Sequence, residues 1–301
     1  MPLRILVLGS AAGGGFPQWN CRCPVCELAW TGDDRVSFRT QSSLAVSADA
    51  CRWLLLNASP DLRQQILAHS QLQPRLAGRH SPIEAVVLTN GDVDHIAGLL
   101  SLRERQRFRI YATGAVLQLL AQNALFRVLD PDLVQPMEIQ LGIPIATGLG
   151  VDIEAFSVPG KIPLHQEKGP VEVGAESDAT IGLRIAGAGV HFFYIPGSAA
   201  IPSALLRRVK GAPLLFFDGT TYTDDEMVRL GLSDKTAHRM GHLAIGGPEG
   251  SLEKLAAAEI DRKIYIHVNN TNPVLIEGSA ERRQVEAAGW EVACDGMEIV
   301  L

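Results

Sequence analysis

The sequence is built from short apolar runs that end in clusters of glycine, proline, serine and asparagine, and this pattern limits the fold more than any other feature. The runs have the length of strands in a sheet. They often follow one another in pairs, with helical patterns between some of them. This order favours an α/β (α+β) fold of the αββα sandwich type over a parallel βαβ array. We expect strands at 3–8, 43–47, 53–56, 85–88, 109–112, 151–158, 181–185, 190–195, 214–217 and 263–266, and helices at 62–67, 96–102, 115–126, 201–209 and 250–258.

The length of 301 residues allows one large domain or two modest ones. No linker rich in serine, glycine or proline divides the chain, so we expect a single domain over residues 1–301 with a Cys-rich zinc loop near 20–27. The net charge of −6 argues against a basic face for nucleic acid. No apolar run approaches the roughly 18 residues of a membrane span, and the start lacks a signal-peptide pattern. We therefore expect a cytoplasmic protein.

Three of the five cysteines lie within six residues, as Cys21, Cys23 and Cys26. A tight turn can bring three sulfurs within reach of one tetrahedral zinc, and a reducing cytosol disfavours disulfides. Two alternatives are three unrelated buried thiols and a redox pair; the second is disfavoured because the segment does not open a helix after a strand. We predict a structural zinc with a fourth ligand from elsewhere. Cys51 and Cys294 are expected to be buried and inert.

A second group of donors follows the apolar run at 85–88 and precedes the expected helix at 96–102. Asp92, Asp94 and His95 place oxygen and nitrogen atoms within four residues of one another, and such donors suit zinc or non-haem iron. A loop after a buried strand is also where α/β folds place ligand groups. The alternative is an Asp-rich turn that only caps the helix.

Three further side chains follow apolar runs or lie in glycine-rich loops. His267 ends the run at 263–266 and opens a polar turn, so it is either a metal ligand or a satisfied core histidine. Asp218 follows the run at 214–217 and either contacts the site or caps the next turn. His242 lies in a loop that could present it to a cleft. The remaining histidines have no such context and are expected on the surface or in the core: His69, His80, His165, His191 and His238.

The stretch from Asn90 to His95 resembles the His-x-His-x-Asp-His loop of the metallo-β-lactamase superfamily. The first two histidines of that motif are replaced by Asn90 and Asp92, whereas Asp94 and His95 are kept. The resemblance implies that His267 is the last histidine ligand. The bridging aspartate should fall where this chain has Gly197.

Two further features resemble particular members of this superfamily. His242 is similar to the proton-donating histidine of members that process tRNA. The cysteine cluster resembles the structural zinc site of cyclic phosphodiesterase members, whose fourth ligand is a histidine; Asn270 stands at that position.

Nearly the whole chain also resembles the protein B family of the biosynthesis of pyrroloquinoline quinone (PQQ), a redox cofactor. The matching stretches are long and unusual in composition: residues 9–21, 39–43, 57–61, 218–220, 224–227, 240–243 and 267–273. The resemblance implies a role in PQQ biosynthesis, with a small-molecule or short-peptide precursor derived from Glu and Tyr as substrate and other pathway proteins as possible partners.

The altered ligand set predicts the chemistry. A two-metal hydrolase needs two ions to clamp the reacting oxygens, and the replaced residues remove the first site, so phosphodiester or lactam hydrolysis is disfavoured. Asp94, His95 and His267 remain, which is the ligand type of mononuclear iron oxygenases. We expect iron or zinc there and hydroxylation of the tyrosine-derived ring, with His242 as acid or base and Asp218 as a weaker candidate. The competing hypothesis is a non-catalytic carrier that assists transport of PQQ or its precursor.

Overall fold

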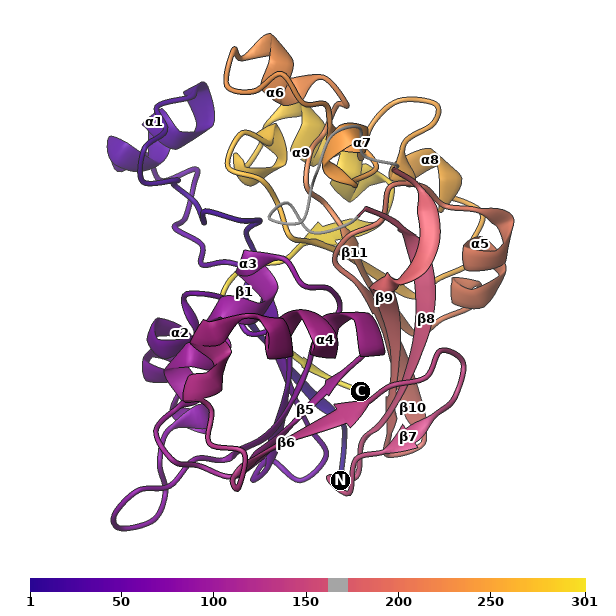
Figure 1. The fold of residues 1–301 in the computed structure, drawn as a ribbon. Helices are drawn as coiled ribbons and strands as arrows, with labels where there is room; N and C mark the ends of the chain where they lie inside the picture. Colours follow the sequence, from indigo (N-terminus) through magenta and orange to yellow (C-terminus); the bar gives the residue numbers. More distant parts are fainter. Residues whose placement is uncertain (162–172) are drawn as a thin grey trace.

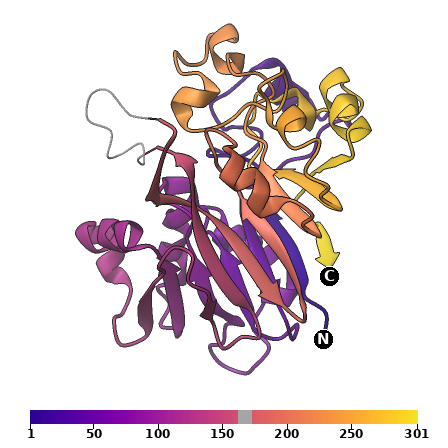
Figure 2. The same ribbon diagram turned by 90° about the vertical axis from the view of Figure 1, so that its right-hand side faces the viewer.

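Two seven-stranded sheets face each other in the computed structural model, which describes residues 1–161 and 173–301 (Figures 1 and 2). The first sheet has the order β14-β1-β2-β3-β4-β5-β6 and the second β13-β12-β11-β10-β9-β8-β7. The first sheet consists of β14 (Glu298–Val300), β1 (Arg4–Gly9), β2 (Ser43–Ser47), β3 (Trp53–Leu56), β4 (Ile83–Val87), β5 (Phe108–Ala112) and β6 (Val134–Glu138). The second consists of β13 (Trp290–Val292), β12 (Arg262–Ile266), β11 (Leu214–Asp218), β10 (Val190–Ile195), β9 (Ala175–Gly187), β8 (Asp152–Gly160) and β7 (Ile145–Ala146).

Each sheet is half parallel and half antiparallel. In the first sheet, β3, β4, β5 and β6 run parallel, while β14, β1, β2 and β3 pair antiparallel. In the second, β10, β11, β12 and β13 are parallel, and β7 to β10 are antiparallel. Because parallel strands end at one edge of a sheet, the loops that follow them gather there.

The central strands, such as β2, β3 and β11, bury both of their faces, which explains the continuous apolar runs in the sequence. Side chains alternate along a strand. In β1, Ile5 and Val7 pack between the two sheets, while Leu6 and Leu8 pack on the outer face of the first sheet. In β10, Phe192 and Tyr194 lie between the sheets. The main core is therefore the layer shared by the two sheets, and each outer face carries a core of its own.

Helices cover both outer faces of the sandwich (Figure 1). Val116, Leu119 and Leu120 follow helical spacing on α4 and pack on the first sheet. Leu205 of α5 and Val285 of α9 pack on the second sheet. The α-helices are α1 (Pro24–Trp30), α2 (Leu62–Ala68), α3 (Val93–Ile96), α4 (Gly114–Gln122), α5 (Ser203–Val209), α6 (Glu226–Arg229), α7 (Ala237–Met240), α8 (Ser251–Lys254) and α9 (Ala280–Ala287). The short 3₁₀ segments are η1 (Ser70–Leu72), η2 (Ala97–Leu102), η3 (Ala124–Val128) and η5 (Pro273–Leu275). No helix among the described residues is long and apolar enough to cross a membrane.

The predicted αββα sandwich is confirmed, and the expected strands lie within one to a few residues of their predicted bounds, except that β9 is much longer. Some helices are shorter than expected. The helix predicted at 96–102 is the 3₁₀ segment η2, and the one predicted at 250–258 continues beyond α8 only as turns. Those turns still bury Leu255 and Ala258, so the apolar spacing reflects burial rather than a long helix.

Two expectations about the cysteines are wrong. The cysteine segment does open a helix, although no strand leads directly into it: Pro24 occupies the first position of α1, where its missing N–H costs no hydrogen bond, Cys23 is the N-cap, and β1 ends at Gly9. Cys51 and Cys294 are exposed rather than buried. Both lie just outside strands, Cys51 in the turn between β2 and β3 and Cys294 after β13, where the chain leaves the core.

Candidate metal centre and active site

The loops that follow β1, β4, β11 and β12 meet at one edge of the sandwich. The turn after β4 carries Asp94 and His95, and β12 leads directly into His267. The β1 loop joins them through a hydrogen bond from the Ala12 amide to the Val268 carbonyl, 2.9 Å long. Side chains far apart in the sequence therefore converge because of how the two sheets are wound.

Asp94, His95 and His267 form a compact group of metal-ligating atoms. One ligand atom from each side chain lies within 4.8 Å of the others. The shortest distance, 2.9 Å, joins Asp94 Oδ2 and His267 Nε2, and Asp94 Oδ2 lies 3.9 Å from His95 Nε2. Both histidines are almost fully buried. Two imidazoles and one carboxylate are a donor set that suits iron or zinc.

Asn90 orients the His95 ring. Its Oδ1 atom lies 2.8 Å from His95 Nδ1 and accepts a hydrogen bond from it, so the proton belongs on Nδ1. His95 Nε2 is then an acceptor, and it is buried with no hydrogen-bond partner. A buried, unpartnered lone pair is costly, and a metal ion is the partner that the neighbouring carboxylate and imidazole imply. The residue that replaces a family histidine thus holds another histidine in a ligating orientation.

Thr220 orients His267 in the same way. The Thr220 hydroxyl accepts a hydrogen bond from His267 Nδ1 at 2.9 Å, which leaves Nε2 toward Asp94. His267 also has a backbone φ of 60°, a conformation that costs free energy in a residue other than glycine and is held only where the surroundings demand it. The strained turn directs the ring into the group of ligands.

Charge and burial act together on this group. Burial alone would raise the pKa of Asp94, but the neighbouring His95 and the hydrogen bond from His267 outweigh burial and hold the pKa below its ordinary range. Burial lowers the pKa of His95 to about 4. Asp94 is therefore anionic and His95 is neutral near pH 7, as metal binding requires. Burial lowers the pKa of His267, but the hydrogen bond to Asp94 and the charge of Asp94 outweigh burial and raise that pKa, so a bound metal would take the place of the proton on His267 Nε2.

Asp218 and His242 form a dyad next to this group. Asp218 Oδ2 accepts hydrogen bonds from His242 Nδ1 at 2.7 Å and from the Ser198 amide at 3.0 Å. Its Oδ1 accepts bonds from the Thr220 amide at 3.0 Å and hydroxyl at 2.7 Å. The fully buried carboxylate is thus saturated with donors. Asp218, His242 and His267 also place one ligand atom each within 4.8 Å of the others. The hydrogen bond from Nδ1 to Asp218 nevertheless fixes the orientation of the His242 imidazole, as in acid–base dyads.

The dyad is stacked on the metal-ligating group. The rings of His242 and His267 lie 5.2 Å apart between centroids and 22° from parallel. Burial would raise the pKa of Asp218, but the charge of His242 and its hydrogen bond outweigh burial and lower that pKa. Gly197, which replaces the family's bridging aspartate, lies beside the dyad: a Cβ built there would be 3.5 Å from His242 Cε1.

A cavity of about 310 Å³ opens onto both groups. Asp92 lines it and accepts a 3.2 Å hydrogen bond from the Asn90 amide, but Asp92 belongs to none of the close groups of ligand atoms among residues 1–161 and 173–301. The lining also contains three cationic side chains that sequence reasoning did not single out: Lys161, Lys235 and Arg239. Of the histidines expected to be unrelated to a site, His165 lies outside the described residues.

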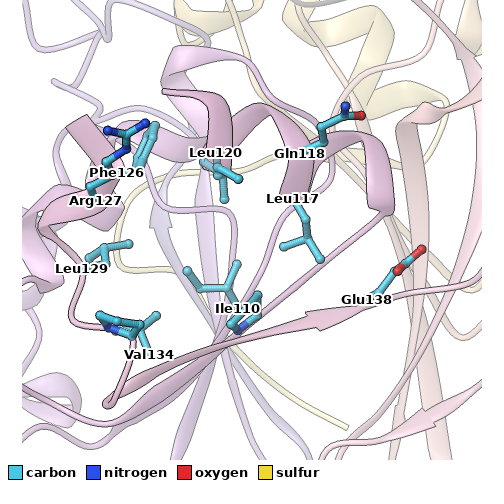
Figure 3. Close-up of a pocket in the computed structure, with 12 residues that line it drawn as sticks. Ile110, Leu117, Gln118, Leu120, Phe126, Arg127, Leu129, Val134 and Glu138 are labelled. Atoms are coloured by element: carbon cyan, nitrogen blue, oxygen red, sulfur yellow. The ribbon is translucent and has the colours of Figure 1, made fainter. Parts of the chain in front are cut away.

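A larger pocket, about 620 Å³, lies between α4, η3 and the strands β5 and β6. Figure 3 shows that aliphatic and aromatic side chains surround it, among them Leu117, Ile110 and Phe126. Arg127 and Glu138 are its only charged lining residues within the described part of the chain. It has none of the ligand groups found at the smaller cavity, so its size does not make it the better candidate for chemistry.

The cysteine cluster is closed and lies on the other side of the turn that begins at His267. The sulfurs of Cys21, Cys23 and Cys26 lie within 4.8 Å of one another and are buried. Cys23 Sγ accepts a 3.4 Å hydrogen bond from the Cys26 amide, and Cys21 Sγ accepts one from the Cys23 amide. The hydrogen bond from Cys23 lowers the pKa of Cys26, although burial opposes this. Three convergent sulfurs in N–H-rich surroundings fit a thiophilic cation such as zinc.

Sequence reasoning missed two positioning groups and the cations of the cavity. Thr220 lies two residues after Asp218, and the sequence marks Asn90 only as a replaced ligand. Their hydrogen bonds to His267 and His95 depend on the fold. The one available signal was the Asp-Gly-Thr-Thr turn after a buried strand, since hydroxyls at strand ends often support neighbouring ligands.

Comparison with known proteins gives concordant matches. Residues 52–268 match the model of the β-lactamase superfamily domain. A coenzyme PQQ synthesis protein B of Methylorubrum extorquens is 53% identical over 299 residues, covering 99% of this chain and 100% of the relative. The crystal structure of Zn²⁺-bound PqqB from Methylobacterium extorquens superposes with a TM-score of 0.97 at 53% identity, covering 99% and 100% of the two chains. A diphosphatase of the PhnP family, 21% identical over 100% and 98% of the chains, shares the fold with a TM-score of 0.72.

Proposed function

Because the chain belongs to the coenzyme PQQ synthesis protein B family within the β-lactamase superfamily, and so acts in PQQ biosynthesis, we propose that it is a metal-dependent hydroxylase of a tyrosine-derived precursor. The observation that carries the proposal is the group of Asp94, His95 and His267, whose ligand atoms lie within 4.8 Å at the floor of a cavity. Two histidines and one carboxylate leave coordination positions for dioxygen and substrate on a bound iron.

The bound iron would supply the activation of dioxygen. One oxygen atom enters a ring C–H bond to give C–OH, and the other leaves as water with two electrons from an external reductant and two protons. Asn90 and Thr220 hold the two imidazoles with Nε2 toward the ligand group. His242 is placed to give or take a proton beside the reacting ring, because Asp218 fixes its orientation through Nδ1.

Burial supports the same interpretation. His95 and His267 are almost fully buried, while the cavity above them holds about 310 Å³, the size of a small-molecule site. The ligand side chains are held by their surroundings, while their ligand atoms face a cavity that a small substrate can enter. Such a site favours a small aromatic molecule or dipeptide over a folded partner.

We also propose that the zinc of this protein is structural and bound by Cys21, Cys23 and Cys26. The relative solved with Zn²⁺ is 53% identical and superposes almost completely. Three buried sulfurs are the softer of the two donor sets, and soft ligands favour zinc over ferrous iron. Within the described part of the chain, the three cysteines are absent from the lining of the cavity above His267, which suits a site that holds α1 to the turn after β12.

The test is turnover of a glutamyl-tyrosine peptide by protein loaded with ferrous iron, under dioxygen and with ascorbate as reductant. We expect oxygen uptake and a mass gain of one or two oxygen atoms that carry label from ¹⁸O₂. The competing carrier function predicts no mass gain together with tight binding of PQQ itself. Zinc-dependent hydrolysis of a phosphodiester or lactam, lost in His95→Ala, would instead show that a hydrolytic site survives.

A further inference from the structure

Glu226 is a buried carboxylate that the proposed chemistry does not use. It is the first residue of α6 and is only 4% exposed, although glutamate is seldom buried so completely. Among the described residues, no lysine or arginine forms an ion pair with it, and Arg229 on the same helix pairs with Asp225 at 3.1 Å. Burial raises the pKa of Glu226, and the hydrogen bonds that its carboxylate accepts act in the opposite direction. A buried carboxylate of this kind is tolerated only where its oxygen atoms have donors.

Both oxygen atoms of Glu226 accept a hydrogen bond. Oε1 accepts one of 2.5 Å from the Thr271 hydroxyl, and Oε2 accepts one of 2.8 Å from the Tyr222 amide. The Thr271 oxygen in turn accepts a 2.6 Å hydrogen bond from Asn269 Nδ2. The side chains of Glu226, Thr271 and Asn269 are all buried. They form a continuous chain of hydrogen bonds, which we call the Glu226 bridge.

The Glu226 bridge joins the two segments that carry the proposed chemistry. Glu226 belongs to the segment after β11, which also carries His242. The other two members of the bridge belong to the turn that starts at His267, and Asn269 lines the same cavity as both histidines. The two segments also meet through the main chain, because the Asn269 amide donates to the Thr220 carbonyl at 2.9 Å. The bridge adds an attachment two residues farther along the turn.

We propose that Glu226 is a positioning residue, whose carboxylate holds the turn of His267 against the segment of His242 and so sets the metal ligands and the dyad relative to each other. The inference rests on the proposed function for the chemistry, while the bridge itself is tested by metal binding. His267 has a φ of 60°, a conformation that persists only where the surroundings hold it. Without its acceptor on Glu226, the Thr271 hydroxyl would be buried and unpaired, so the turn would relax.

The bridge needs a carboxylate, because its two donors face different oxygen atoms. An amide offers one acceptor and one donor end. Glu226→Gln therefore keeps the shape of the side chain but leaves either the Thr271 hydroxyl or the Tyr222 amide without its own acceptor. Thr271→Val removes the hydroxyl with little change in shape, and Thr271→Ser keeps it. These three variants separate hydrogen bonding from packing.

The experiment measures the affinity of the zinc-containing protein for cobalt(II) at Asp94, His95 and His267 under anaerobic conditions, together with the visible absorption of the bound ion. We expect Glu226→Gln and Thr271→Val each to weaken cobalt affinity about ten-fold or more and to alter the absorption, since outer-shell partners contribute in this range. Thr271→Ser should match the wild type. The double variant should bind no more weakly than the more affected single one, because the two groups act as a unit.

Glu154→Gln is the matched control. The Glu154 side chain is also mostly buried, at 18% exposure, and accepts a 2.8 Å hydrogen bond from Arg208. It lies on β8 and is absent from the lining of the cavity. We expect cobalt affinity and absorption to stay at the wild-type values in this variant.

Unchanged cobalt affinity and absorption in Glu226→Gln overturn the proposal even if the melting temperature falls, because a purely structural role lowers stability alone. If Glu226→Gln does not fold, the Thr271 pair decides: equal affinities of Thr271→Val and Thr271→Ser contradict the bridge. Failure of the proposed function is a separate result. Hydroxylation at wild-type kcat and KM in Glu226→Gln removes the positioning role and keeps the chemistry. Weakened cobalt binding in a protein that hydroxylates nothing keeps the positioning role and removes the chemistry.

Discussion

The two groups of ligands differ in hardness and in access, although one turn contributes to both. His267 belongs to the open site and Asn270, three residues later, faces the cysteines. The cysteine site offers soft sulfurs that are buried. The other site offers two imidazoles and a carboxylate beneath a cavity of about 310 Å³. Under the proposed function, this contrast separates a structural metal site from a reacting one by ligand type and water access rather than by distance.

The largest expected effect comes from removing the His267 side chain, because only one of the two sites uses it. We expect His267→Ala to abolish turnover and to lose the active-site metal, since one of three ligands disappears and Asp94 loses its 2.9 Å partner. The zinc content should stay at one per chain, because the cysteine site draws on other side chains. Metal analysis and turnover of the same preparation check both halves. Loss of both metals together would show that the sites are not independent.

A substitution of His242 changes the reacting site but leaves its three metal ligands in place. His242→Ala should slow turnover by roughly 10²–10⁴-fold if the imidazole transfers a proton, with metal content unchanged. Asp218→Asn should have a similar effect, since the ring loses the acceptor that fixes its tautomer. His80→Ala is the control, because His80 does not line the cavity and bonds only the Arg75 amide among the described contacts. A variant that loses metal instead would make His242 a ligand.

Asn90 is expected to have a smaller effect. Asn90→Ala removes the acceptor that holds His95 Nδ1 at 2.8 Å, and outer-shell partners of this kind typically contribute about 10–100-fold in metal affinity or activity. Titration with ferrous iron under anaerobic conditions measures the change. An unaltered affinity would mean that burial alone fixes the His95 ring.

The cysteine site should matter least for turnover and most for stability. Cys23→Ser should lose one zinc per chain and lower the melting temperature, with a loss of stability smaller than the roughly 10 kcal/mol of small zinc domains, because the core between the sheets remains. Turnover per folded, iron-loaded chain should change little. Cys51→Ser is the matched control, since that thiol is exposed and lies outside the cluster. A variant that keeps its full zinc content would place the zinc elsewhere.

The layers of the fold could be predicted from the sequence because each apolar run carries its own burial pattern. The meeting of Asp94, His95 and His267 could be predicted too, because residues that follow parallel strands share a sheet edge. The hydrogen bonds of Asn90 and Thr220 could not, since these join residues only after the sheets pack. Helix α1 was not predicted, although a proline such as Pro24 is typical of the first position of a helix.

The cations of the cavity show the same limit. Lys161 follows β8, while Lys235 and Arg239 belong to the segment before α7 and to α7 itself. No motif joins them, and only the fold brings them to the lining of one cavity. Burial of isolated cysteines was overestimated for a related reason. Cys51 and Cys294 lie beside strands in the sequence, but the chain turns outward at both positions.

The central claim, that soft and hard metals are divided between the two sites, is tested most directly by anomalous diffraction. Crystals of protein purified anaerobically with ferrous iron are measured at the zinc and iron absorption edges. The claim predicts zinc among Cys21, Cys23 and Cys26, and iron among Asp94, His95 and His267. Zinc in both sites of a protein that hydroxylates its substrate, or iron among the cysteines, would contradict it.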